Sequence, residues 1–135
     1  MRSGQGLLDT SVVILLDQLG EESDLPEEPL ITVVTLAELS VGPLVTDDET
    51  ERAARQSRLQ VTEASFDPLP FDAAAARAFG RVAAELRRSG RTARARSFDA
   101  MIAATALARE LPVFTANPDD FTGIEGLEVV AVIVE

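Results

Sequence analysis

The chain has 135 residues, a length typical of one ordinary domain, and 46% of them are hydrophobic. It contains no His, Cys, Lys or Tyr, which excludes imidazole bases, thiolate nucleophiles, Schiff bases and zinc sites with the usual ligands. The formal net charge of -11 argues against a protein that holds nucleic acid by a basic surface alone. Any catalysis therefore depends on carboxylates, hydroxyls, amides and arginine.

The same composition predicts one cytoplasmic domain over residues 1–135. Without cysteine the chain carries no disulfide, so nothing points to an oxidising compartment. The segment at residues 1–6 is short and polar and does not have the pattern of a signal peptide. No apolar run approaches the roughly 20 residues that a membrane-spanning helix needs. We therefore expect no membrane association.

The first half of the chain predicts two strands, each followed by a helix. Residues 6–9 predict a short strand, and residues 12–19 predict a helix that opens just after it. Past a proline-containing loop, the β-branched run at 30–34 predicts a buried parallel strand. Residues 35–41 then predict a helix that is ended by the Gly-Pro pair at 42–43.

The second half continues the alternation. Ser97 is expected to cap a helix, and the prolines near position 69 indicate an extended, edge-like piece. In chain order we predict a helix at 46–61, the extended piece at 66–71, helices at 72–88 and 97–109, and strands at 111–115 and 127–134. This pattern predicts an α/β fold with a largely parallel sheet.

Acidic side chains follow three of the predicted strands or lie one helical turn beyond them. Asp9 follows the first strand, Glu38 lies just past the second, and residues 117–120 follow the strand at 111–115. Ligands of open α/β sheets bind at the carboxyl ends of the strands. Carboxylates there suit Mg²⁺ or Mn²⁺, ions that often act on phosphate esters.

Asp99 is expected to join this acidic pocket from a helix. Its neighbours three, four and seven positions on are Ile102, Ala103 and Ala106, so its carboxylate projects from an apolar face. Burying an unpaired carboxylate is costly, and sharing a metal ion is one remedy.

Five arginines fall within ten positions just before Asp99. They are Arg87, Arg88, Arg91, Arg94 and Arg96. A solvated helix end explains any single one of them. Beside a candidate metal site, phosphate binding is about as probable for the cluster.

Each acidic residue also has a purely structural explanation. Asp9 could cap a helix, Thr35 and Glu38 fit a capping box, and Asp99 near a helix start is favoured by the helix dipole. Residues 117–120 could form an Asx-type turn. For any single residue, the structural explanation is more probable than a role in a functional site. Four such explanations holding at one edge of one sheet are less probable than one shared acidic site.

The motifs in this order resemble the PIN-domain ribonucleases of the VapC toxin type. They are Leu8-Asp9-Thr10-Ser11, Thr35-Leu36-Ala37-Glu38-Leu39, the stretch from Asp99 to Ala106, and Val113-Phe114-Thr115-Ala116-Asn117 with Asp120-Phe121. The resemblance covers nearly the whole chain. It implies a three-layer α/β/α sandwich with a mainly parallel central sheet and a Mg²⁺- or Mn²⁺-dependent endoribonuclease.

The resemblance also implies roles for particular residues. Asp9, Glu38 and Asp99 match the first three acidic positions of the family, as catalytic residues and metal ligands. The family often has an acid where this chain has Asn117, so Asp119, as a metal ligand, or Asp120, as a catalytic residue, is expected to take over. Contacts to RNA are expected from Thr10, Ser11, Arg91, Arg94 and Arg96. A homodimer and a cognate antitoxin that covers the acidic cleft are implied as well.

The main alternative is a non-catalytic α/β interaction domain whose acidic cleft binds a basic partner peptide. Among enzymes, receiver domains and haloacid-dehalogenase-type phosphatases also build acidic Mg²⁺ pockets at this edge of a sheet. Both use a lysine that this chain lacks, and the stretch from Asp9 to Ser11 has no second aspartate. They are therefore disfavoured.

Overall fold

A computed structural model of the chain describes residues 4–20, 23–91 and 96–133. Its sheet has four strands in the order β2-β1-β3-β4, and every neighbouring pair is parallel. The strands are β1 (Gln5–Leu8), β2 (Glu28–Leu30), β3 (Val113–Thr115) and β4 (Val129–Ala131). The predicted parallel α/β sheet is confirmed.

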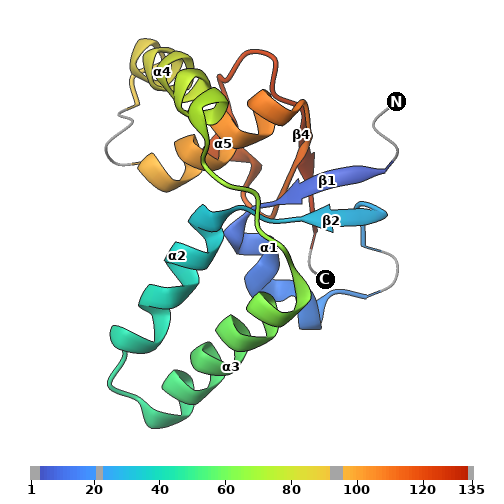
Figure 1. The fold of residues 1–135 in the computed structure, drawn as a ribbon, viewed down its shortest axis with the longest axis vertical. Helices are drawn as coiled ribbons and strands as arrows, with labels where there is room; N and C mark the ends of the chain where they lie inside the picture. Colours follow the sequence, from blue (N-terminus) through green and yellow to red (C-terminus); the bar gives the residue numbers. More distant parts are fainter. Residues whose placement is uncertain (1–3, 21–22, 92–95, 134–135) are drawn as a thin grey trace.

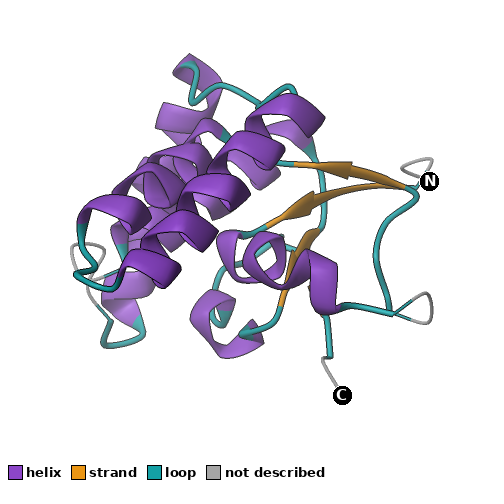
Figure 2. Cartoon of the chain, turned by 90° about the horizontal axis from the view of Figure 1, so that it is seen from below, coloured by secondary structure: helices purple, strands orange, loops and turns teal. Residues whose placement is uncertain are grey.

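Five α-helices surround this sheet in the described part of the chain (Figures 1 and 2). They are α1 (Thr10–Leu15), α2 (Val33–Val41), α3 (Glu49–Ser65), α4 (Ala73–Arg88) and α5 (Ser97–Arg109). Short 3-10 turns are η1 (Leu16–Gln18), η2 (Gly42–Leu44) and η3 (Pro118–Phe121). Among the described residues, no helix is both long and apolar enough to span a bilayer.

Hydrophobic clusters lie on both faces of the sheet, as the alternating side chains of its strands require. Leu7 packs with Val82 of α4 and Ala103 of α5, whereas Leu8 packs in a second cluster with Val12 of α1 and Val132. Leu7 and Leu8 are both fully buried. The two clusters account for the three layers, with α4 and α5 on one side of the sheet and α1 and α3 on the other (Figure 1).

The second strand was predicted at 30–34, but β2 covers Glu28–Leu30, so the prediction is displaced along the chain and shares only Leu30 with it. The strand stops at Leu30, and Val33 and Val34 already belong to α2. Thr32 causes this change because its hydroxyl accepts a hydrogen bond from the backbone N–H of Thr35 and so caps the helix. The β-branched side chains are compatible with either state, and the cap decides between them.

Other boundaries move for similar reasons. The helix predicted at 46–61 begins at Glu49 because Asp48 caps it, and it runs on to Ser65. Ser97 does not cap α5, since Arg96 occupies the cap position and offers no side-chain hydrogen bond there. The last two strands are shorter than predicted. The extended piece at 66–71 is confirmed in part, because its residue Leu69 bridges to Thr32.

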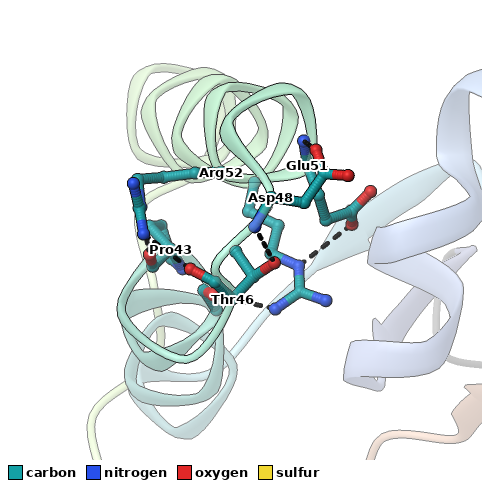
Figure 3. A network of polar contacts seen from close by, with 7 residues as sticks. Pro43, Thr46, Asp48, Glu51 and Arg52 are labelled. Carbon is teal, nitrogen blue, oxygen red and sulfur yellow. Dashed lines mark hydrogen bonds and ion pairs between the residues drawn. The ribbon is translucent and has the colours of Figure 1, made fainter.

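The connection between α2 and α3 is fixed by arginine side chains (Figure 3). Arg52 donates to the carbonyl oxygens of Pro43 and Thr46, at 3.1 and 2.6 Å. Arg55 donates to the carbonyl oxygen of Gly42 at 2.9 Å. These bonds satisfy carbonyl groups in the turn that follows α2. They tie α3 to the end of the helix that carries Glu38.

Candidate active site

Asp9 lies at the carboxyl end of β1 and is almost fully buried, with 4% exposure. It caps α1 by accepting a bond from the N–H of Val12, as its structural explanation predicted. Its two carboxylate oxygens also accept hydrogen bonds from Ser11 at 2.6 Å and Thr115 at 2.8 Å. Burial nevertheless raises the pKa of Asp9, against the opposing effect of these bonds. Asp9 therefore accepts two side-chain hydrogen bonds beyond the one that caps the helix.

Glu38 faces Asp9 from the second turn of α2. Its Oε1 atom accepts a hydrogen bond from the Thr10 hydroxyl at 2.6 Å, and the Thr10 and Thr35 hydroxyls are 3.0 Å apart. The predicted capping box is wrong, because Thr32 rather than Thr35 caps this helix. Burial raises the pKa of Glu38, and the charge of Asp9 raises it further.

Asp99 lies in the first turn of α5, on the side of the helix that was predicted to be apolar. Ile102, Ala103 and Ala106 are all fully buried, which confirms that face. Burial raises the pKa of Asp99, the charges of Asp120, Asp9 and Glu38 raise it further, and the resulting pKa is about 6. The four carboxylates therefore interact electrostatically. We call Asp9, Glu38, Asp99 and Asp120 the acidic cluster.

Three residues after β3 were candidates for the fourth position. Asn117 and Asp119 are exposed, whereas Asp120 is partly buried. The charge of Asp120 raises the pKa of both Asp9 and Asp99. Asp120 also forms an ion pair with Arg96, in which Nη1 and Oδ1 are 2.6 Å apart. Of the three, Asp120 is therefore the residue that the geometry ties to the other carboxylates.

Hydroxyl groups hold the cluster in place. Besides bonding Asp9, Ser11 accepts a hydrogen bond from the Ala116 N–H at 3.1 Å, and Thr115 accepts one from the Asn117 N–H at 2.9 Å. The start of α1 is thereby joined to the end of β3. Thr10 and Ser11 were predicted to contact RNA, and in the structure their hydroxyls position carboxylates. Their contact with RNA stays a prediction.

The predicted arginine cluster is only partly within the described residues. Arg94 lies outside them. Arg91 donates to the carbonyl oxygen of Thr122 at 3.2 Å, and Arg96 reaches Asp120. Arg87 and Arg88 are exposed at the end of α4. The structure thus brings Arg96 to the acidic cluster.

Sequence analysis missed two arginines on the other side of Glu38. Arg55 and Arg58 of α3 line a pocket of about 330 Å³ together with Thr10 and Glu38. The signal was present as arginines at every third position, 52, 55 and 58, which lie near one another on a helix. What the sequence could not show is that α3 folds back beside α2.

The donor atoms of the acidic cluster suit a hard divalent cation, because all of them are carboxylate oxygens. No three acidic side chains in the described part of the chain converge closely enough to form a ready-made metal site. Like charges that raise one another's pKa also repel, so an open arrangement is the one expected without a cation. In chemical type the residues fit Mg²⁺ or Mn²⁺.

Comparison with known proteins identifies the fold family. The family model for the PIN domain matches residues 7–127, a span that runs from β1 past η3. The chain belongs to the PIN-domain family.

Individual PIN-domain relatives agree with this. Ribonuclease VapC5 of Mycobacterium tuberculosis is 43% identical over 131 residues, covering 95% of this chain and 93% of the relative. Ribonuclease VapC8 of the same species is 37% identical over 103 residues, covering 76% of this chain and 91% of the relative. The crystal structure of VapBC-5 from M. tuberculosis, a member of the VapBC family of toxin-antitoxin systems, superposes with a TM-score of 0.78. That match has 38% identity and covers 96% of this chain and 99% of the other. The resemblance to VapC-type PIN domains is thus confirmed, and so is the α/β/α sandwich.

Proposed function

We propose that this PIN-domain protein is a Mg²⁺- or Mn²⁺-dependent endoribonuclease and the toxin of a toxin-antitoxin pair. The observation that carries the proposal is the acidic cluster, in which Asp9, Glu38, Asp99 and Asp120 meet at the carboxyl edge of a parallel sheet. Relatives at 43% and 37% identity that are named ribonucleases support it.

Asp9, Glu38, Asp99 and Asp120 are the residues that would hold the cation. A divalent ion bound there supplies an activated water and neutralises charge that develops on the scissile phosphate. Asp119 is exposed and next to Asp120, so it would act through water, and Asn117, predicted as a catalytic residue, is exposed as well.

The chain's own residues keep the carboxylates ready for this role. Ser11 and Thr115 each bond one oxygen of Asp9, which fixes the plane of the carboxylate, and Thr10 donates a single hydrogen bond to Oε1 of Glu38. Because the pKa of Asp99 is about 6, its carboxylate is mainly charged at neutral pH and able to bind a cation. Hydroxyl donors also favour the charged form of each group they contact.

Arginines on both sides of the acidic cluster would hold the RNA backbone. Arg96 pairs with Asp120, Arg91 donates to the carbonyl oxygen of Thr122, and Arg58 lies beside Glu38 in the pocket lined by α3. One guanidinium group can bind two phosphate oxygens at once. Arginine can therefore supply the phosphate contacts in a chain that lacks lysine. Arg94, which was also predicted to contact RNA, lies outside the described residues.

An antitoxin and a second copy of this chain are the proposed protein partners. The structure of VapBC-5 is that of a toxin-antitoxin system, which supports a cognate antitoxin here. A net charge of -11 favours an antitoxin segment that is basic where it meets the acidic cluster. The homodimer rests on the family resemblance.

The deciding experiment incubates the purified protein with a total RNA pool, with and without Mg²⁺ or Mn²⁺, and maps the new RNA ends. We expect cleavage that a chelator stops and that Asp9→Asn abolishes. Binding of RNA or of a basic peptide without any cleavage would instead support the non-catalytic interaction domain. Cleavage that survives the chelator would contradict the metal dependence.

A further inference from the structure

Arg96 is a cation built into an otherwise acidic site. Its backbone begins α5, because its carbonyl oxygen accepts a hydrogen bond from the N–H of Ala100 at 2.8 Å. The side chain crosses to η3 and pairs with Asp120 at 2.6 Å. Arg96 is thereby fixed to the same helical turn that carries Asp99.

The charge of Arg96 lies next to two aspartates of the acidic cluster. Its Nη1 atom is 2.6 Å from Oδ1 of Asp120, and its backbone directly precedes the first turn of α5, which carries Asp99. The side chains of Arg96 and Asp120 are 36% and 33% exposed, so the pair lies at the edge of the site rather than in the core. Such a pair can open without exposing apolar surface.

We propose that Arg96 is the internal counter-ion of the acidic cluster and competes with a divalent cation for Asp120. This inference rests on the proposed metal dependence. The guanidinium holds Oδ1 of Asp120 at 2.6 Å, and its charge repels any cation that approaches Asp99. Binding a divalent ion through Asp120 therefore requires the ion pair to open. Arg96 consequently sets the affinity for metal and, once released, is free to contact a phosphate.

The chain offers a matched control on the same helix. Arg109 lies at the other end of α5 and also pairs with an aspartate, Asp72, at 3.7 Å. The exposures of these two side chains, 38% and 44%, resemble those of the Arg96 pair. Arg109→Gln and Arg96→Gln thus remove the same charge from an ion pair with an aspartate, but only Arg96→Gln does so at the acidic cluster, where it also removes a hydrogen bond of 2.6 Å.

Calorimetric titration of the purified protein with Mn²⁺ at low salt tests the inference without reference to RNA cleavage. We expect Arg96→Gln to bind Mn²⁺ about tenfold more tightly than the unaltered chain, because a unit charge a few ångströms from a divalent ion is removed. Arg109→Gln should leave the affinity unchanged. Arg96→Lys, which keeps the charge but loses the planar fork, should give a smaller increase and serves as the test if the glutamine variant does not fold.

A double-mutant cycle with Asp120→Asn separates competition for Asp120 from a general charge effect. The increase caused by Arg96→Gln should shrink when Asp120 is already replaced. An equal increase in both backgrounds, or no increase in either, overturns the inference and leaves the metal site itself standing. Failure of every variant to bind Mn²⁺ overturns the metal dependence and the counter-ion role together.

Discussion

Two regions of this protein concentrate charged side chains, and they differ in how those charges are balanced. In the connection between α2 and α3, Arg52 pairs with Glu49 and Arg55 pairs with Glu51, and both arginines also bond carbonyl oxygens. Figure 3 shows the bonds from Arg52 to the carbonyl oxygens of Pro43 and Thr46. In the acidic cluster, the charges of Asp120, Asp9 and Glu38 raise the pKa of Asp99, and Arg96 pairs with Asp120. The arginines of the first region are thus paired with acidic side chains, whereas in the second region the carboxylates outnumber the arginine that pairs with them.

The comparison suggests how to recognise a functional cluster of charges. Three members of the acidic cluster have a raised pKa, each through burial together with a like-charged neighbour. Carboxylates that are buried, have a raised pKa and lack a matching positive charge indicate a binding site, because a cationic ligand can supply that charge.

The sharpest contrast between the regions is expected in catalysis. Asp99→Asn should lower divalent-dependent RNA cleavage by about 100-fold or more, because an amide is a poor substitute for a charged metal ligand. Asp48→Asn is the control, since asparagine caps a helix as well as aspartate does. Initial rates on one RNA substrate at saturating Mn²⁺ measure both variants. Similar rates for the two would remove Asp99 from the catalytic site.

The reverse contrast is expected in stability. Arg52→Ala should lower the free energy of unfolding by about 1–2 kcal/mol, because it leaves the carbonyl groups of Pro43 and Thr46 without their donor. Its ion pair with Glu49 is exposed and should contribute little. Urea denaturation measures the loss, and Mn²⁺ affinity should not change. A loss below the experimental error would show that the turn is held by packing alone.

Glu38 provides a smaller effect that separates its two possible roles. Glu38→Gln should weaken Mn²⁺ binding about tenfold while leaving the melting temperature nearly unchanged, because the amide oxygen can still accept the bond from Thr10. A variant with normal Mn²⁺ affinity and normal cleavage would return Glu38 to a structural role. Circular dichroism and calorimetry on one preparation give both values.

The sequence predicted the sheet and most helices because their signals are local. Alternating burial in the strands, and the aspartates that cap α3 and α4, depend on neighbours within a few positions. The boundary at Thr32 was missed because the same β-branched residues suit a strand or a helix. In the site, Asp9 and Asp99 could be located from their place at a strand end and on an apolar face. Arg58 could not, because its approach to Glu38 depends on how α3 packs against α2.

The pH dependence of stability gives the smallest expected effect and tests the charge imbalance directly. In the folded protein the pKa of Asp99 is about 6, above its ordinary value of 3.8. Between these values the folded chain binds more protons than the unfolded chain, so the contribution of Asp99 to stability rises as the pH falls and is lost as the pH rises through about 6. Burial raises the pKa of Asp9 and Glu38 as well, so both act in the same direction.

Asp99→Asn mimics the protonated carboxyl and should therefore remove this dependence. In a chelator at about pH 7.5, the variant should be more stable than the unaltered chain by about 1 kcal/mol, after allowance for the partial solvent exposure of the cluster. At about pH 5 the difference should shrink, because Asp99 is then largely protonated in the folded protein. Thermal melts of both chains at the two pH values measure the change, and comparing the chains cancels the titration of carboxylates outside the cluster. If Asp99→Asn were more stable than the unaltered chain by the same amount at both pH values, the charged neighbours of Asp99 would not destabilise its ionised form. The acidic cluster would then not differ from the α2–α3 connection in its effect on stability.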